Sequence, residues 1–263
     1  MAAAMKNKPN KTGNENKNYH RFFVGAECIS ETEVILSAQQ THQICNVLRL
    51  KAGERIVVLD NSGNEHEVLL TTVEKSQIVC EIVEKRRAAG EPAIEMTLFQ
   101  SMLAREKFEF VLQKCTEVGA ARFVPVITEH CIVQKGKIKE GKFERWKTIL
   151  KEASEQSHRG RIPKLDEPVK FFEALEQTAD FDCVLISVPS AKLNLRECLS
   201  NCRKAKRIGL FIGPEGGFSQ AEIDQAGAKG VLEFGMGPRV MRTETAAVVA
   251  AALILYELGE MEY

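Results

Sequence analysis

The stretches that decide the fold are RIGLFIGPEGGFS at residues 207–219 and VLEFGMGPRVMRTETAA at residues 231–247. Each begins with a short apolar run typical of a buried strand, continues through a loop that contains glycine and proline, and ends where a helix is expected to begin. Strands that alternate with helices in this way indicate an α/β domain with a mostly parallel sheet. Because ligands of such sheets bind at the carboxyl ends of the strands, we expect the binding site at these loops.

The same alternation extends back to residue 92. We expect strands at 94–102, 122–133, 182–189, 207–213 and 231–235, and helices at 105–119, 144–156, 194–202, 219–230 and 243–258. The last helix is apolar on nearly all of its faces, which indicates burial either in the core or in a subunit interface, with the interface favoured. The lone Trp146 lies on the apolar face of its helix and is expected in the core.

The chain before residue 92 has a different pattern. Short strands are expected at 21–24, 33–36, 55–60, 67–73 and 77–83, with a turn at 61–64 and a helical piece at 42–50. This pattern predicts a small β-barrel-like domain over residues 19–90, followed by the α/β domain over residues 91–263. Residues 85–92 have the charge, glycine and proline of a linker, and residues 1–18, which lack apolar periodicity, are expected to be a flexible tail.

The composition is that of an ordinary globular protein. Of 263 residues, 44% are hydrophobic and 27% are charged, which excludes a disordered chain, a collagen-like fibre and a coiled coil. The sequence has no apolar run of the roughly 20 residues that a membrane helix needs and no signal-peptide pattern, so we expect no membrane partner and a cytoplasmic protein. The eight cysteines form no CxxC pair and are expected to be reduced thiols, with no metal site.

The charge is unevenly distributed along the chain. There are 36 basic and 36 acidic residues in total, and a net charge of zero argues against a nucleic-acid partner. However, residues 92–170 hold 15 Lys and Arg against 11 Asp and Glu, whereas residues 171–263 hold 9 against 13. Residues 130–164 alone hold ten basic and four acidic side chains. This local excess predicts salt-sensitive binding of a nucleic acid across residues 130–164 and the barrel.

The loop at 213–219 has the features of a turn that a ligand can approach closely. Gly213, Gly216 and Gly217 permit positive φ angles, and Ser219 with Glu222 predicts a capped helix start. The loop is neither a dinucleotide nor a P-loop fingerprint, and by itself it fits a plain tight turn as well as a binding loop. In the next loop, Arg239 and Arg242 can either clamp a phosphate, stabilise negative charge on a base, or lie solvated on the surface.

Six motifs together resemble the ribosomal RNA small subunit methyltransferase E family of the SPOUT class. They are IGPEGGFS (212–219), GPRVMRTETAA (237–247), RFFV (21–24), HQICNVLRLKAGE (42–54), QKCTEVG (113–119) and EQSHR (155–159). The resemblance implies a PUA-like β-barrel that holds RNA, then a trefoil-knotted α/β domain that binds S-adenosylmethionine. It also implies a homodimer, formed through the knotted domain and the C-terminal helix, that methylates N3 of one uridine in the decoding region of 16S rRNA, as free RNA or in the small ribosomal subunit.

The resemblance also implies roles for individual residues. The cofactor is expected at the three loops that follow the strands, at Val188, Pro189, Gly213, Glu215, Gly217, Met236, Gly237, Arg239, Val240 and Met241. Neutral uracil carries a proton on N3, so methylation there needs a base or a nearby cation. Arg242 with Thr243 or Thr245 is the expected catalytic group, and Glu215 is the second choice for removing the proton. RNA phosphates are expected at Arg21, Arg49, Lys51, Arg105, His158, Arg159 and Arg161.

Two other classes of protein were weighed against this interpretation. An NAD(P)-dependent oxidoreductase predicts a glycine fingerprint at the first strand-to-helix turn of the α/β domain, but SMLAREKF at 101–108 contains no glycine. A non-catalytic RNA-binding module is harder to exclude, because binding loops can survive the loss of chemistry. The presence of Glu215, Arg239 and Arg242 argues mildly against that module.

Overall fold

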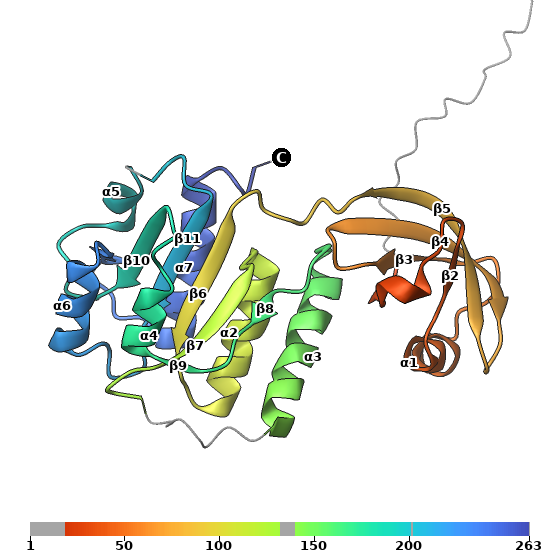
Figure 1. Ribbon diagram of the computed structural model, residues 1–263, viewed down its shortest axis with the longest axis horizontal. Coiled ribbons are helices and arrows are strands. Elements are labelled where there is room, and N and C mark those ends of the chain that lie inside the picture. Colours follow the sequence, from red (N-terminus) through yellow and green to blue (C-terminus); the bar gives the residue numbers. More distant parts are fainter. Residues whose placement is uncertain (1–18, 132–139, 201, 263) are drawn as a thin grey trace, which may run out of the picture.

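The computed structural model describes residues 19–131, 140–200 and 202–262. Two sheets lie side by side in Figure 1, one formed by the first part of the chain and one by the second. The predicted tail at residues 1–18 lies outside the described residues. Among the described residues, no helix is long and apolar enough to cross a bilayer.

The first sheet is the predicted barrel-like domain. Its strands pair in the order β1-β3-β4-β5-β2. The strands are β1 (Arg21–Phe23), β2 (Glu33–Ile35), β3 (Arg55–Leu59), β4 (Asn64–Val73) and β5 (Ile78–Arg87). Alternating apolar residues such as Phe22, Ile56 and Leu70 point into one core, as the period of two in the sequence requires.

Two local features of this domain differ from the prediction. The helical piece begins earlier than expected, as α1 (Ala38–His42), and continues as a π-helix, η2 (Gln43–Leu48), which ends at Arg49 in the left-handed conformation; a short 3₁₀ turn, η1 (Ala26–Cys28), precedes both. In addition, β5 extends to Arg87, where it pairs with Asn64. The first three residues of the predicted linker are therefore part of a strand.

The second sheet is parallel in every recorded pairing. Its order is β12-β10-β11-β6-β7-β8, and β9 also pairs with β7. The strands are β6 (Glu95–Ser101), β7 (Arg122–Ile127), β8 (Lys164–Leu165), β9 (Val169–Lys170), β10 (Cys183–Ser187), β11 (Arg207–Ile212) and β12 (Leu232–Phe234). This arrangement confirms the predicted α/β class.

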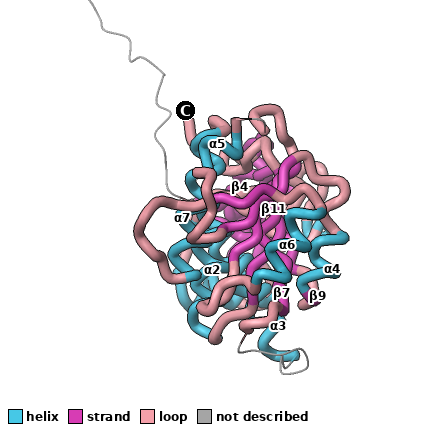
Figure 2. Tube along the Cα trace, turned by 90° about the vertical axis from the view of Figure 1, so that its left-hand side faces the viewer, coloured by secondary structure: helices cyan, strands magenta, loops and turns pink. Residues whose placement is uncertain are grey.

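Helices cover both faces of the parallel sheet, as Figure 2 shows. The core on one face includes residues from α2 (Arg105–Val118), α3 (Glu140–Gln156), α5 (Leu195–Leu199) and α7 (Thr243–Glu257). The core on the other face includes residues from α4 (Phe171–Glu176) and α6 (Gln220–Ala228). Trp146 is fully buried against Phe108, which confirms the prediction that it belongs to the core.

The sequence patterns missed some elements and misplaced others. Helix α4 and the two-residue strands β8 and β9 were not predicted, because such short segments show no full period of apolar residues. Helix α7 begins at Thr243, as predicted, with Arg242 at its N-cap position. The expectation of reduced thiols is wrong for one pair, because Cys183 and Cys202 form a disulfide. Spacing in the sequence could not reveal this pair, since the fold brings the two cysteines together.

The trefoil knot stays a prediction, because strand order and pairing do not by themselves define a knot. What the structure does show is how the two sheets are joined. The Arg161 guanidinium donates to the Ser62 carbonyl at 2.9 and 3.1 Å, and the Gly63 amide donates to the Gly160 carbonyl at 3.2 Å. The turn between β3 and β4 is therefore bound to the segment that follows α3.

Candidate active site

The three loops singled out in the sequence follow β10, β11 and β12, which are neighbours in the sheet with β10 in the middle of this group. Because the strands are parallel, their carboxyl ends bring the loops to one edge. Two hydrogen bonds join the first loop to the third: the Val188 amide donates to the Phe234 carbonyl at 3.0 Å, and the Gly235 amide donates to the Leu193 carbonyl at 2.9 Å. These loops therefore form one surface.

The second loop is held from both sides. The Thr243 hydroxyl, at the first turn of α7, donates to the Gly213 carbonyl at 2.5 Å. On the other side, Ser219 and Glu222 form the predicted capping box, and the second carboxylate oxygen of Glu222 accepts the Glu129 amide at 2.9 Å. Glu222 is thus a bracket between α6 and the end of β7, which fixes the loop in place.

The glycines of these loops leave room for a ligand. Gly217 and Gly237 have φ angles of +70° and +89°, and a Cβ added at either would have no atom within 4 Å. Residues with a side chain rarely adopt these φ angles. Glycine therefore permits this backbone conformation, and it also leaves the space open. Val240, on the third loop, is 85% exposed, so its side chain is accessible to a ligand.

Polar atoms without partners lie close to the same edge. Gln100 and Ser101, at the end of β6, are fully buried, yet the Gln100 Oε1 and Ser101 Oγ atoms accept no hydrogen bond from the described protein atoms, and neither does the Glu244 Oε2 atom. The side-chain nitrogen of Gln100, Nε2, donates a hydrogen bond to Thr243 Oγ1 at 3.4 Å. Buried polar atoms are normally paired. These orphan atoms and the open glycines fit a ligand with hydroxyl and amino groups, such as the S-adenosylmethionine that the resemblance implies.

A group of charges lies at the mouth of this surface. The Lys107 ammonium, at the start of α2, donates to the Glu215 carboxylate at 2.7 Å. Partial burial favours a higher pKa for Glu215, but the hydrogen bond and the charge of Lys107, with a backbone donor, outweigh it and lower this pKa below its ordinary value. The hydrogen bond from Lys107 to Glu215 raises the pKa of Lys107, while Glu244 and Arg242 act on it in opposite directions. Lys107, Glu215, Arg242 and Glu244 therefore form one electrostatic cluster.

Two residues of this site escaped the sequence analysis. Lys107 lies in a helix whose charges looked like an ordinary solvated face, so no pattern separated it from its neighbours. His130 is not among the residues expected at this site, yet its ring is exposed and its Nδ1 atom lies 3.2 Å and 3.1 Å from the carbonyl oxygens of Gly216 and Gly217. Two carbonyl acceptors place the proton on Nδ1. His130 thus supports the glycine loop.

The predicted cofactor residues lie on the three loops. Val188 and Pro189 follow β10, Gly213 ends β11 and leads to Glu215 and Gly217, and the remainder follow β12. Most are exposed or half-buried, whereas Val188 is buried in the core. Of the predicted catalytic residues, Arg242 and Thr245 are exposed, and Thr243 is buried with its hydroxyl already bound to Gly213. The structure therefore brings the predicted catalytic and cofactor residues to the same edge.

Among the cations expected at RNA phosphates, Arg159 has a structural role instead. Its side chain is 2% exposed, its guanidinium pairs with Glu91 at 3.1 Å, and it donates to the Thr116 carbonyl at 3.2 Å and to the Ala120 carbonyl. The expectation of a phosphate contact is corrected for this residue, because no part of the guanidinium is free to leave the interior. Arg21, 8% exposed, pairs with Glu65, so a phosphate would have to displace that carboxylate.

The other predicted RNA contacts lie on the surface. Arg49, Lys51, His158 and Arg161 are exposed. His158 adopts a positive φ of 60°, and its pKa is lowered by burial of the ring and by the charge of Arg21. The side chain of Arg105 and residues 132–139 of the predicted basic segment lie outside the described residues. In the described ranges, no group of three or more His, Cys, Asp and Glu side chains is placed to hold a metal ion.

Comparison with known proteins agrees with both halves of this architecture. Residues 90–255 match the RNA methyltransferase domain family, and residues 36–83 match the RNA methyltransferase PUA domain family. Ribosomal RNA small subunit methyltransferase E of Bacillus subtilis is 31% identical over 84% of this chain and 89% of its own. The protein of the same name from Synechocystis is 32% identical over 89% of this chain and 77% of its own.

A solved structure shares the whole fold. The crystal structure of ribosomal RNA small subunit methyltransferase E from Neisseria gonorrhoeae, bound to S-adenosylmethionine, covers 90% of this chain and 97% of its own with a TM-score of 0.82 and 31% identity. The chain therefore belongs to the ribosomal RNA small subunit methyltransferase E family.

Proposed function

We propose that this protein methylates N3 of a uridine in the decoding region of 16S rRNA, with S-adenosylmethionine as the methyl donor. The observation that carries the proposal is the single edge at which open glycines, orphan polar atoms and the Arg242 cluster meet. Methyltransferase activity and the cofactor follow from the family. The N3 atom and the place of the uridine in the decoding region are what the resemblance to this family implies, and they are the part of the proposal that the experiment below tests.

For the cofactor, we propose contacts with the ten loop residues named from the sequence. These are Val188, Pro189, Gly213, Glu215, Gly217, Met236, Gly237, Arg239, Val240 and Met241. The bound cofactor supplies a methyl group on a positively charged sulfur. Gly217 and Gly237 let the backbone approach it closely, and Gln100 and Ser101 offer oxygen atoms that lack partners.

For the chemistry at N3, the main requirement is to stabilise the uracil anion. Loss of the N3 proton places negative charge on the two flanking carbonyl oxygens, and preorganised cations lower the free energy of that charge. Arg242 is exposed and occupies the N-cap position of α7, where the helix dipole adds positive potential. We assign to Arg242 the role of orienting the base and stabilising its anion.

Thr243, Thr245 and Glu215 have different parts in this proposal. The Thr243 hydroxyl is already donated to Gly213, so it positions the loop and does not react. Thr245 is exposed two residues further along α7 and is available to the base. Because Lys107 lowers the pKa of Glu215, this carboxylate is a weak base and is better suited to hold Lys107 beside the substrate than to remove the proton.

For the RNA, we propose that the barrel and the segment after α3 bind the phosphates together. Arg49 and Lys51 lie exposed on the first domain, and His158 and Arg161 lie exposed at the junction with the second. Arg105 completes the set. The division of the chain into residues 19–90 and 91–263 is part of this proposal, because it gives each half a separate contact with one RNA.

For the assembly, we propose a homodimer formed through the α/β domain and α7. One side of α7 packs into the core through Ala247, Ala251 and Ile254, but Tyr256 is 59% exposed and Leu253 is exposed as well. An apolar surface of this kind marks an interface more often than a free surface. A dimer mass in solution at micromolar concentration is the expected result. We place the enzyme in the cytoplasm, where ribosomes are assembled.

The test is methyl transfer to a defined atom. The full chain is incubated with labelled S-adenosylmethionine and small ribosomal subunits that lack this modification, and the label is mapped by mass spectrometry of the digested RNA. We expect label on N3 of one uridine, and naked 16S rRNA shows whether the subunit is needed. Transfer to another atom contradicts the assignment of N3. Cofactor binding with no transfer to either substrate indicates a non-catalytic RNA-binding module.

A further inference from the structure

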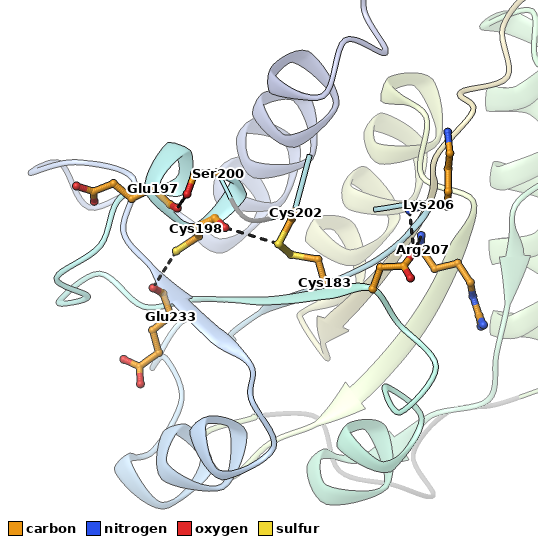
Figure 3. The surroundings of a disulfide bond; sticks show 9 residues. Cys183, Glu197, Cys198, Ser200, Cys202, Lys206, Arg207 and Glu233 are labelled. Carbon is orange, nitrogen blue, oxygen red and sulfur yellow. Dashed lines mark hydrogen bonds between the residues drawn. A yellow bond between two sulfur atoms is a disulfide. The ribbon is translucent and has the colours of Figure 1, made fainter. Parts of the chain in front are cut away.

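The disulfide between Cys183 and Cys202 lies away from the active site. Cys183 is the first residue of β10, so it is at the amino end of the strand, whereas Val188 and Pro189 follow its carboxyl end. Cys202 lies beyond α5, with its Cα atom 5.9 Å from that of Cys183. Figure 3 shows the bond between the start of β10 and the segment that follows α5.

A cavity lies beside this bond, whose two cysteines are otherwise buried. Its volume is about 280 Å³, and both cysteines line it, together with Phe181, Ala179, Glu176 and Lys229. Lys229 and Glu176 pair at 2.8 Å, and both are exposed, so the cavity opens to solvent beside them. This volume is slightly below the range of small-molecule pockets, which is roughly 300–1,000 Å³. It admits a small molecule but not the surface of another protein.

The bond is also connected to the active-site loops. In sequence, Val188 and Pro189 lie between the two cysteines. The thiol of Cys198 in α5 donates to the Glu233 carbonyl of β12 at 3.5 Å, as Figure 3 shows. Val188 and Leu193, which both lie between the two cysteines in the sequence, make the two hydrogen bonds that join the first loop to the third. The disulfide therefore closes the far end of a covalent loop whose near end lines the proposed cofactor site.

We propose that Cys183–Cys202 is a thiol–disulfide exchange site for a low-molecular-mass thiol that enters this cavity, and that reduction of the bond weakens binding of S-adenosylmethionine. The inference about the cofactor rests on the proposed function. The thiolate of the small molecule attacks one protein sulfur and forms a mixed disulfide, and the bond between the two cysteines breaks. The other cysteine leaves as a thiolate and takes a proton from water.

A second molecule of the thiol completes the exchange. It attacks the sulfur of the first, releases the small-molecule disulfide, and leaves the remaining cysteine as a thiol. Two thiols are oxidised to one disulfide, and the protein gains two electrons and two protons. The loop that carries Val188 and Pro189 then loses one covalent restraint and has more conformations to give up when the cofactor binds.

The test compares two redox states of the full chain. The dissociation constant of S-adenosylmethionine is measured by calorimetry before and after treatment with 2-mercaptoethanol, and thiols are counted by alkylation and mass spectrometry. We expect two additional thiols, at Cys183 and Cys202, and a dissociation constant that rises by about fivefold or more, the lower range for coupled sites. No variant is needed for this comparison, so a folding defect cannot obscure it.

Three variants provide controls. C202S is expected to bind the cofactor as weakly as the reduced protein and to show no response to 2-mercaptoethanol. C80S removes a thiol that is fully buried in the barrel and has its pKa raised to about 12 by burial, and it should respond like the natural chain. A179W fills the cavity and should slow the reduction without changing the dissociation constant of the oxidised protein.

The outcomes separate this inference from the proposed function. If Cys183 and Cys202 are alkylated in protein that has not been reduced, or if both redox states bind S-adenosylmethionine equally, the inference is overturned and the function is not affected. If reduction is equally fast in A179W, the cavity is not the route and the exchange site is overturned. If neither redox state binds the cofactor, the proposed function fails, and this inference fails with it.

Discussion

Two ion pairs, one inside the α/β domain and one at the active site, each join a cation to a glutamate in different surroundings. Arg159 is buried, and its guanidinium is bound by Glu91 and by two backbone carbonyls. In contrast, Lys107 and Glu215 are each about one-third exposed. In the described structure, Glu215 is the one recorded hydrogen-bond partner of Lys107. A cation that is fully bound inside the protein cannot exchange its partners for a ligand. A cation in a partly exposed pair can exchange its partner for a ligand. Burial, more than residue type, therefore separates structural from functional cations here.

The largest expected effect is on the buried pair. R159A leaves Glu91 without its counterion and removes the guanidinium donor from the Ala120 carbonyl, whereas the Thr116 carbonyl keeps the Gly119 amide as a donor. Breaking a buried pair in this way costs about 3 kcal/mol, so the free energy of unfolding, measured by urea denaturation, should fall by about that amount. R159K keeps the charge but not the planar fork, and should lose less. A loss below about 1 kcal/mol would show that this pair is not a structural element.

The next effect is on catalysis and leaves stability nearly unchanged. Arg242 is exposed, so R242A should fold normally and bind S-adenosylmethionine with an unchanged dissociation constant. Its kcat should fall about 100-fold, the lower limit for loss of one group that stabilises an anion. The measurements are single-turnover methyl transfer and calorimetry, with R242K as the matched variant that keeps the charge. An equal loss of turnover and of cofactor affinity would assign Arg242 to cofactor binding.

The same contrast explains how far the sequence alone could lead. The strands and helices around the site were predictable, because the apolar period and the Ser219–Glu222 cap are local in sequence. Motif resemblance located the Arg242 loop for the same reason. Burial, in contrast, depends on the fold and not on the local sequence. Arg159 resembles any other cation in the sequence, and only the fold places Glu91 beside it. Lys107 resembles an ordinary surface lysine, and only the fold places Glu215 beside it. The Cys183–Cys202 bond likewise depends on tertiary contacts.

The smallest expected effect concerns the exposed pair, and it appears in the pH profile. Because solvent screens this pair, K107A should leave the free energy of unfolding nearly unchanged. Lys107 donates one hydrogen bond to a charged group, so its loss should lower kcat about tenfold. Lys107 holds the pKa of Glu215 below its ordinary value, against the effect of burial. In K107A this pKa should rise.

The direction of the pH effect follows from that rise. Where ionised Glu215 is required, activity is retained above its pKa and lost as the pH falls through it, so the acidic limb of kcat/KM should move to higher pH in K107A. K107R keeps a cation beside Glu215 and should return the limb to its original position. E215Q, which cannot titrate, should remove the limb. If the acidic limb does not move in K107A and persists in E215Q, it reports the titration of another group. Lys107 would then act on the substrate directly, because an exposed cation needs no carboxylate to stabilise the uracil anion.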